Sequence, residues 1–333
     1  MVSGIQSVIV VCLLVTWVGV LVRRDSFAPP AVTHATIKFT HILPAVLQMV
    51  LFAYWACHWP EVIEHLPVIA IQLAVAYAID VLLAWTLRRP YSPSLGPLPI
   101  VLSINLFVWF LPGEILLYAL VVAIALSSKT FLLSAGRHIF NPSVFAIAVV
   151  GMLCILLPGW FQYRDISHDF SRPPHMAHLI VLLALIPQVR LRTAPVAVGA
   201  VLSMLGVMLL VDALTGYRGG PSPWWPPWLL TITLLAGDPA TIPSGSVSRL
   251  LFGLFLGATF YLVSRGLLFT VGTDFFAKVI PIPLANLLVP SFERVTPRLS
   301  ARWPGLRRVT GNGAYVAAWI SMAILMLLAN RWT

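Results

Sequence analysis

The sequence predicts an all-α polytopic membrane protein with about 12 transmembrane helices, ten of which form a core of two inverted five-helix repeats. Three observations lead to this prediction. The 333-residue chain is 59% hydrophobic and only 10% charged, with a mean hydropathy of +0.92. Long apolar runs alternate with short loops, and basic residues gather in every second loop. Similar polar motifs also recur in the two halves of the chain.

The apolar runs define the predicted helices. A helix needs roughly 20 apolar residues to cross about 30 Å of hydrocarbon. Runs of this kind occur at 4–22, 39–58, 62–87, 97–112, 115–134, 140–158, 176–189, 194–214, 225–236, 250–268, 276–291 and 313–330. The runs at 176–189 and 225–236 are short for a complete crossing, whereas the rest are long enough or nearly so.

The net charge of +10 raises the question of a nucleic-acid partner, but the distribution of the charges argues against one. Basic residues occupy alternate loops, at Arg23, Arg24 and Lys38, Arg88 and Arg89, Lys129 and Arg137, Arg190 and Arg192, Arg249, and Arg294 to Arg308. The positive-inside rule places these loops in the cytoplasm and both termini outside. Anionic lipids are the expected partner of the charges, and no nucleic acid is expected.

Two segments, 39–158 and 176–292, carry the same features in the same order. Each has an aspartate near a helix end, a proline-rich junction, a short apolar run, a helix ending in a cation, and an asparagine close to a proline. The paired residues are Asp80 and Asp212, Lys129 and Arg265, and Asn141 and Asn286. Each segment is predicted to contain five helices. Because five is odd, the second segment begins on the opposite side of the membrane, and the repeat is inverted. The remaining parts are an N-terminal anchor helix and cytoplasmic loop (1–38), an external loop (159–175), and a basic loop with a C-terminal helix (293–333).

Inverted repeats commonly form a binding site at their interface, where broken helices present unpaired backbone groups. The polar candidates at such breaks are Arg137, His138, Asn141, Asp238 and Asn286. The two basic side chains could hold a phosphate or a carboxylate from the other repeat, or cap a helix end. The asparagines could coordinate an ion or bridge helices as packing contacts. The aspartate could initiate a turn before its proline.

The ordered motifs resemble those of a known membrane-protein family. They are Gly136-Arg137-His138-Ile139-Phe140-Asn141-Pro142 after Lys129, Ala236-Gly237-Asp238-Pro239-Ala240-Thr241, and Leu284-Ala285-Asn286-Leu287-Leu288-Val289-Pro290. They resemble motifs of the NqrB/RnfD family, which comprises membrane subunits of sodium-pumping NADH:quinone oxidoreductase and of the Rnf electron-transport complex. The resemblance covers about 39–294. The Gly136-Arg137-His138 form of the first motif is similar to that of a divergent branch of the family, the UnbU-type proteins found beside enediyne biosynthesis enzymes.

The resemblance implies an electron-transfer subunit of the bacterial inner membrane that binds flavin or quinone and works with other membrane or redox subunits. The family carries FMN on the threonine of a Ser-Gly-Ala-Thr motif. The corresponding stretch here follows Asp212 and reads Thr215-Gly216-Tyr217-Arg218. Covalent FMN is not expected, because Arg218 at the acceptor position cannot form the ester. Noncovalent FMN or riboflavin stays open, with Arg218 pairing with a phosphate and Tyr217 stacking on the ring.

Other functions stay open at this level. A non-redox transporter or ion-conducting subunit could use the same scaffold, and a structural subunit could retain a vestigial site. Haem is not expected, because the eight histidines show no paired spacing and no Cys-x-x-Cys-His motif is present. The three cysteines lie at unrelated spacings and predict no metal site. No self-contained catalytic site is recognised.

Overall fold

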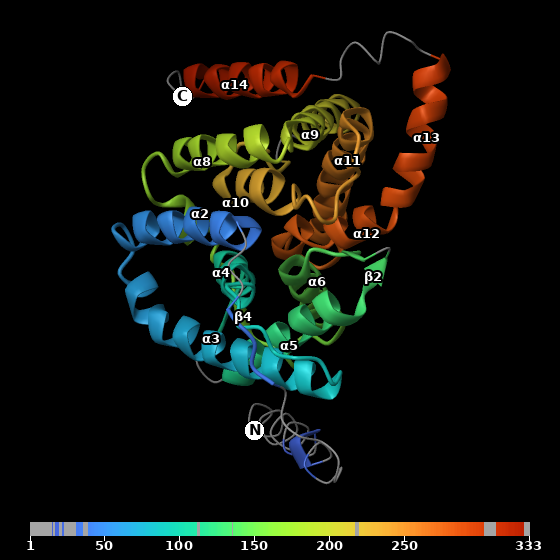
Figure 1. The fold of residues 1–333 in the computed structure, drawn as a ribbon. Coiled ribbons are helices and arrows are strands. Elements are labelled where there is room, and N and C mark those ends of the chain that lie inside the picture. Colours follow the sequence, from blue (N-terminus) through green and yellow to red (C-terminus); the bar gives the residue numbers. More distant parts are fainter. Residues whose placement is uncertain are drawn as a thin grey trace.

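The computed structural model is mostly helical (Figure 1). It describes residues 15, 17–19, 22, 31–35, 39–111, 114–134, 136–216, 220–302 and 311–329. Most of the predicted N-terminal part, 1–38, lies outside the described residues. Among those described there, Trp17 donates a hydrogen bond from Nε1 to Thr86 Oγ1 at 3.0 Å. This contact joins the N-terminal part to the first predicted repeat.

The first predicted repeat contains five α-helices: α2 (Phe39–Ala56), α3 (Glu61–Thr86), α4 (Pro97–Phe107), α5 (Ile115–Phe131) and α6 (Pro142–Leu156). Their starts follow from the sequence. Pro97 and Pro142 occupy the first turns of α4 and α6, where a missing backbone N–H costs no hydrogen bond. The Asn141 side chain caps α6 by accepting from the Val144 N–H.

The second predicted repeat has the same order but more breaks. Its elements are α8 (Met176–Arg190), α9 (Ala194–Thr215), α10 (Pro226–Leu230) with the π-helical turn η1 (Thr231–Leu235), α11 (Ser246–Thr270), and the 3-10 turn η2 (Phe275–Lys278) with α12 (Pro281–Leu287). The run predicted at 276–291 is therefore three short pieces, because η2 and α12 are followed after one residue by α13 (Val289–Arg302).

Corresponding elements pack in corresponding pairs within the two segments. In the first, α4 contacts α2 and α3, while α5 contacts α3 and α6. In the second, α10 and η1 contact α8, η1 contacts α9, and α11 contacts α9 and α12. Between the segments, α2 contacts α8 and α6 contacts α12. The first helices of the two segments thus contact each other, and so do the last helices.

Helices α9 and α11 approach very closely at three glycines. A Cβ atom at Gly257 would lie 2.0 Å from the Ala200 carbonyl oxygen, and one at Gly253 would lie 2.3 Å from that of Val196. At Gly199 a Cβ would lie 2.6 Å from the Leu250 carbonyl oxygen. The Gly253-x-x-x-Gly257 spacing is typical of close helix packing in membranes, and the sequence analysis did not use it.

Among the described residues, three helices are long and apolar enough to cross a membrane: α3, α9 and α11. A fourth crossing results if η2 with α12 and the following α13, bent by 54° at a break, are one span. The other apolar helices of the described chain have shorter spanning stretches. The structure thus supports a helical protein with three to four candidate spans. The count of about 12 stays a prediction.

The predicted external loop, 159–175, is structured. Strand β4 (Tyr163–Arg164) pairs antiparallel with β1 (Trp109–Phe110), which follows α4 and shortens the predicted helix 97–112. Helix α7 (Ser167–Ser171) comes next, and its Asp169 forms ion pairs with Arg164 at 3.0 Å and Arg172 at 2.9 Å. The segment therefore attaches to the end of α4.

The C-terminal helix expected at 313–330 is present as α14 (Asn312–Ala329), whereas the start of the predicted basic loop differs from expectation. The basic stretch predicted as a loop continues as α13 to Arg302, and α14 packs on α8 and α9 (Figure 1). A short hairpin, β2 (Leu133–Ser134) and β3 (Arg137–His138), joins α5 to α6. Gly136, with φ of +74°, occupies its turn, a backbone conformation that glycine adopts without strain. The hairpin places the Arg137 motif at the junction of the two segments.

Candidate ligand pocket between the two segments

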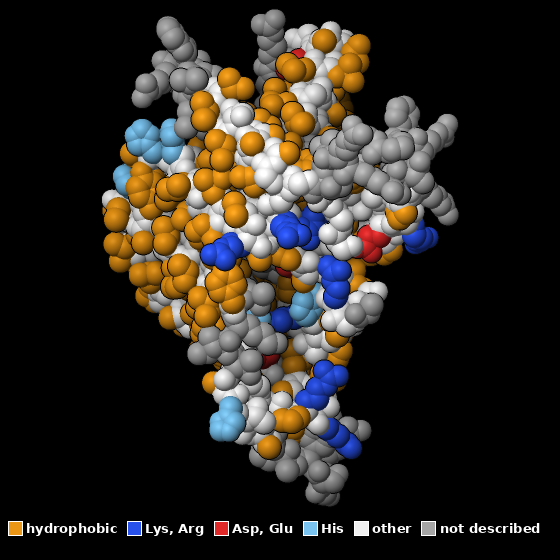
Figure 2. Space-filling view, turned by 45° about the horizontal axis from the view of Figure 1, so that its top comes forward, with side chains coloured by type: hydrophobic (Ala, Val, Ile, Leu, Met, Phe, Trp, Pro, Cys, Tyr) orange, Lys and Arg blue, Asp and Glu red, His pale blue; other side chains and the backbone are white. Residues whose placement is uncertain are grey.

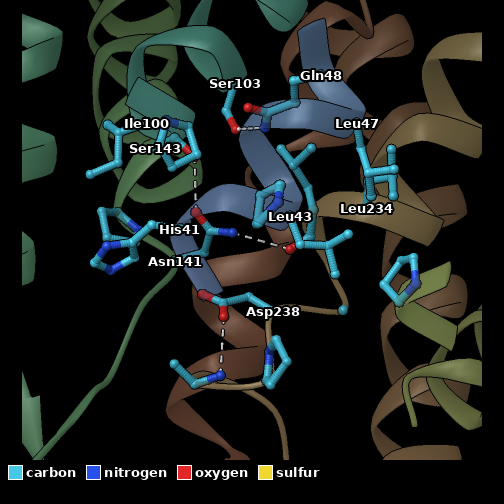
Figure 3. Close-up of a pocket in the computed structure, with 18 of the residues that line it drawn as sticks. His41, Leu43, Leu47, Gln48, Ile100, Ser103, Asn141, Ser143, Leu234 and Asp238 are labelled. Atoms are coloured by element: carbon cyan, nitrogen blue, oxygen red, sulfur yellow. Dashed lines mark hydrogen bonds between the residues drawn. The ribbon is translucent and has the colours of Figure 1, made fainter. Parts of the chain in front are cut away.

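A cavity of about 310 Å³ lies where α2, α4 and α6 meet α8, η1 and the loop after η1. Leu43, Leu47, Ile100 and Leu234 form apolar parts of its wall. Figure 3 shows polar side chains from several elements turned toward the same space, among them His41, Gln48, Asn141 and Asp238. The pocket thus combines apolar walls with a few convergent polar groups, as small-molecule sites do.

The pocket borders a break in the second segment. Helical backbone stops at Leu235 and resumes at Ser246, so the intervening carbonyl groups lack helical partners. Two side chains of the first segment supply donors. Asn141 donates from Nδ2 to the Leu235 carbonyl at 3.2 Å, and Arg137 donates from Nη2 to the carbonyls of Pro239 at 2.9 Å and Ile242 at 3.2 Å.

Two side chains of the second segment complete this arrangement. Asn286, which is buried, donates from Nδ2 to the Thr241 carbonyl at 2.9 Å. Arg249 donates from Nε to the Pro243 carbonyl at 2.8 Å, and its Nη1 reaches the carbonyls of Leu191 and Arg192. The 236–245 loop is therefore fixed from both segments. Such satisfied backbone is what allows a helix break to persist in an apolar protein.

The fixed loop presents Asp238 to the pocket (Figure 3). The carboxylate Oδ1 accepts a hydrogen bond from the Ala240 N–H at 3.0 Å, so the residue does form the turn expected before Pro239. Burial raises the pKa of this carboxyl, while the Ala240 hydrogen bond and the nearby His138, Arg137 and Lys129 oppose the shift. Asp238 is thus an acid held among cationic side chains.

His138 and Lys129 form the basic side of the pocket. Burial lowers the pKa of His138, and the Lys129 ammonium lowers it further, whereas Asp238 and a hydrogen bond to the backbone of Lys129 raise it. His138 Nδ1 is buried and has no hydrogen-bond partner among the described residues. A Cβ at Gly96 would lie 2.8 Å from Lys129 Nζ, so this glycine leaves room for the ammonium group.

The ten predicted cofactor-binding residues do not form one site. His138, Asn141 and Asp238 line the pocket, whereas Arg137 and Asn286 are not part of its wall and instead hold the 236–245 loop. Of the others, Asp212, Thr215 and Gly216 lie at the far end of α9, a helix of 22 residues and so about 30 Å long, whose first residue follows shortly after Leu191 in the pocket wall. Tyr217 and Arg218 lie outside the described residues.

The described part of this second group has local structural contacts. Asp212 Oδ1 lies 3.5 Å from the Tyr261 hydroxyl group, and Thr215 donates to the Val211 carbonyl at 2.7 Å. Gly216, with φ of +70°, ends α9 by donating its N–H to the Asp212 carbonyl at 2.9 Å. This is the usual role of a glycine in the left-handed region after a helix.

Two polar residues in the pocket wall, Gln48 and Ser103, were not predicted from the sequence. Gln48 Nε2 donates to Ser103 Oγ at 2.6 Å, linking α2 to α4, and both side chains are buried. Gln48 Oε1 has no partner among the described residues. The available signal was a polar residue in the middle of each apolar run, since such residues in membrane helices usually face a partner or a cavity.

The described residues contain no group of three or more His, Cys, Asp or Glu side chains placed to hold a metal ion. No protein-family model matches the chain. A search of curated proteins likewise finds no matching sequence. Together, the helices and the cavity characterise a helical protein with several candidate membrane spans and a pocket between two similarly packed segments.

Proposed function

We propose that the chain is an integral-membrane electron-transfer subunit that binds a flavin or a quinone noncovalently between its two segments. The observation that carries the proposal is the cavity of about 310 Å³ at their junction, with apolar walls and the polar side chains of Asp238, His138 and Gln48. Small-molecule sites begin at roughly this size, about 300 Å³. The ring system of a quinone or a flavin is flat and largely apolar, with polar atoms at its edges.

The polar atoms of the pocket suit such a ring. Two buried atoms, His138 Nδ1 and Gln48 Oε1, have no partner among the described residues and could pair with carbonyl or N–H groups of a ligand. The bound cofactor would supply the redox chemistry. Lys129 would offset negative charge that develops on the ring, and the Asp238–His138 pair would hold or release a proton beside it.

The proposal includes the finer membrane architecture expected from the sequence. We infer about 12 spans, ten of them in two inverted repeats, in a bacterial inner membrane with both termini outside. The corresponding helix contacts within the two segments support a repeat. The contacts of α2 with α8 and of α6 with α12 support a two-fold relation between the segments. Other membrane or redox subunits would deliver and accept the electrons.

Covalent FMN and haem are not part of the proposal. Arg218 stands where the related subunits carry their FMN on threonine, and an arginine cannot form that bond. An FMN held noncovalently by Arg218 and Tyr217 would occupy a second location, since the adjoining residues Asp212, Thr215 and Gly216 are not part of the pocket wall. The pocket therefore does not depend on the 212–218 stretch.

A second candidate function is a non-redox transporter or ion-conducting subunit. The observation that favours it is Asp238, an acid beside cationic groups on a loop that both segments hold. In transporters with inverted repeats, such sites at helix breaks open as one repeat moves against the other. A structural subunit with a vestigial site is the remaining alternative.

The test uses the full chain purified in mild detergent. Its absorbance spectrum before and after denaturation, with mass spectrometry of the extracted small molecules, should show released flavin or quinone. The His138→Gln and Gln48→Ala variants should lose most of the ligand, whereas Thr215→Ala at the far end of α9 should retain it. Finding neither ligand would refute the redox proposal. Solute or ion flux in proteoliposomes, sensitive to Asp238→Asn, would then support the transporter.

A further inference from the structure

Helix α13 (Val289–Arg302) runs across the direction of α2, α8 and α14 (Figure 1). Its axis bends by 54° from the preceding η2–α12 piece. It also carries Glu293, Arg294, Arg298 and Arg302, and charges of this kind are costly inside hydrocarbon. We therefore place α13 outside the membrane interior, on the side of the molecule that carries the predicted cytoplasmic loops.

One face of α13 is fixed to the start of α11 and the loop before it. The Phe292 ring lies 5.9 Å from the rings of Phe252 and Phe255. Ser248 donates a hydrogen bond to Thr296 Oγ1 at 2.7 Å, and Ser244 donates to Glu293 Oε1 from its N–H at 3.0 Å. These contacts hold the helix in its crosswise orientation, beside the end of a candidate span.

The rest of α13 is amphipathic. Positions 294, 298 and 302 are four residues apart, so they fall on one side of the helix. Val295, next around the helix, is 43% exposed, and on α12 Leu284 and Leu287 are 53% and 57% exposed. Exposed apolar side chains and the three arginine positions thus belong to the same two consecutive helices, α12 and α13. This combination is typical of helices that lie in the headgroup layer of a membrane.

We propose that α13 lies in the plane of the cytoplasmic leaflet and binds the headgroups of anionic phospholipids. Val295 and the exposed leucines of α12 would contact the upper acyl region, and the arginines would pair with lipid phosphates. Figure 2 shows several Lys and Arg side chains on the face of the molecule that it draws. The proposal rests on the membrane placement in the proposed function, and it is independent of any cofactor.

The experiment uses the full chain without its three cysteines, labelled with a nitroxide at single introduced cysteines and placed in vesicles. The positions are Val295, the exposed Pro297, which is two residues further along and therefore on the opposite side of α13, and Leu202 on α9 as a control for lipid immersion. The accessibility of each label to oxygen and to a water-soluble nickel chelate is measured with and without phosphatidylglycerol. We expect Leu202 to favour oxygen strongly, Val295 moderately, and Pro297 to favour nickel.

Phosphatidylglycerol should lower the nickel accessibility at Val295. The Arg294→Gln/Arg298→Gln/Arg302→Gln variant should lose this effect. Each arginine removed should reduce the preference for phosphatidylglycerol vesicles by roughly fivefold. Replacing the exposed Arg89 and Arg190 with glutamine should preserve it. Equal nickel accessibility at Val295 and Pro297 in both vesicles, with Leu202 still in lipid, would overturn the proposal and favour an acidic protein partner. A water-exposed Leu202 would overturn the membrane placement itself.

Discussion

Nη2 of Arg137 donates a hydrogen bond to the carbonyl oxygen of Pro239 at 2.9 Å, although the two residues are 102 positions apart. This contact connects the hairpin of the first segment to the broken helix of the second. It gives the arginine, which lies next to an apolar helix, a backbone acceptor for its charged group. The predictions below follow from this junction and from the packing that supports it.

Replacing Arg137 with alanine should loosen the 236–245 loop. The loss of hydrogen bonds to two carbonyl groups should reduce the free energy of unfolding by about 1–2 kcal/mol. Thermal unfolding in detergent measures the effect. Arg89→Ala is a matched control, because Arg89 is an exposed arginine with no side-chain hydrogen bond to the loop. Equal unfolding temperatures for the two variants would show that the Arg137 contacts add no stability.

Two substitutions of Asn141 should separate its two roles. Asn141→Asp keeps the oxygen that accepts from Ser143 and caps α6, but it loses the Nδ2 donor to the Leu235 carbonyl. Asn141→Ala loses both, and an N-cap alone contributes about 1 kcal/mol. We expect both variants to weaken ligand binding in the pocket. If only Asn141→Ala does so, the cap matters and the contact to Leu235 does not.

Gly257→Ala should destabilise the protein more than any other Gly→Ala change on the same helix pair. The new Cβ would lie 2.0 Å from the Ala200 carbonyl oxygen, a backbone atom that cannot move without separating α9 from α11. Overpacking of this kind costs about 1–3 kcal/mol. The control is Gly206→Ala on α9, where a Cβ has nothing within 4 Å and should be neutral or stabilising. The unfolding temperatures of both variants decide the outcome.

His138 should make stability depend on pH. Its pKa in the folded protein is lowered, chiefly by burial, so the folded state binds a proton less readily than the unfolded chain. Stability should therefore be highest above the unfolded pKa of about 6.5 and should decline as the pH falls through the lowered value. Asp238, whose folded pKa is raised, should act in the opposite sense, its contribution to stability declining as the pH rises above the unfolded value of 3.8.

The measurement for this prediction is the unfolding temperature as a function of pH. His138→Gln should show a smaller loss between neutral and mildly acidic pH than the native chain. His175→Gln serves as a control at an exposed histidine remote from the pocket. The same decline in the native chain and in His138→Gln would assign the pH dependence to other groups.

The candidate site was predictable in part. Polar and helix-breaking residues between apolar runs identified Arg137, His138, Asn141, Asp238 and Asn286, because such groups need partners in a membrane protein. Their functions were not predictable. The partners of Arg137, Asn141 and Asn286 are backbone carbonyls of one loop, and no sequence pattern reveals which carbonyls a break leaves unsatisfied. Gln48 and Ser103 meet only because α2 packs on α4.

Hydropathy and proline placement act over neighbouring residues, so the sequence alone was enough to predict a helical, strongly apolar chain and the positions of most helices. The packing of the folded chain settles which helices are interrupted and which residues share a site. It separates Asp212, Thr215 and Gly216 from the pocket, since α9 carries them to its opposite end. It also joins Arg137 to Pro239 across the two segments. Contacts between distant residues depend on packing, which local sequence patterns do not encode.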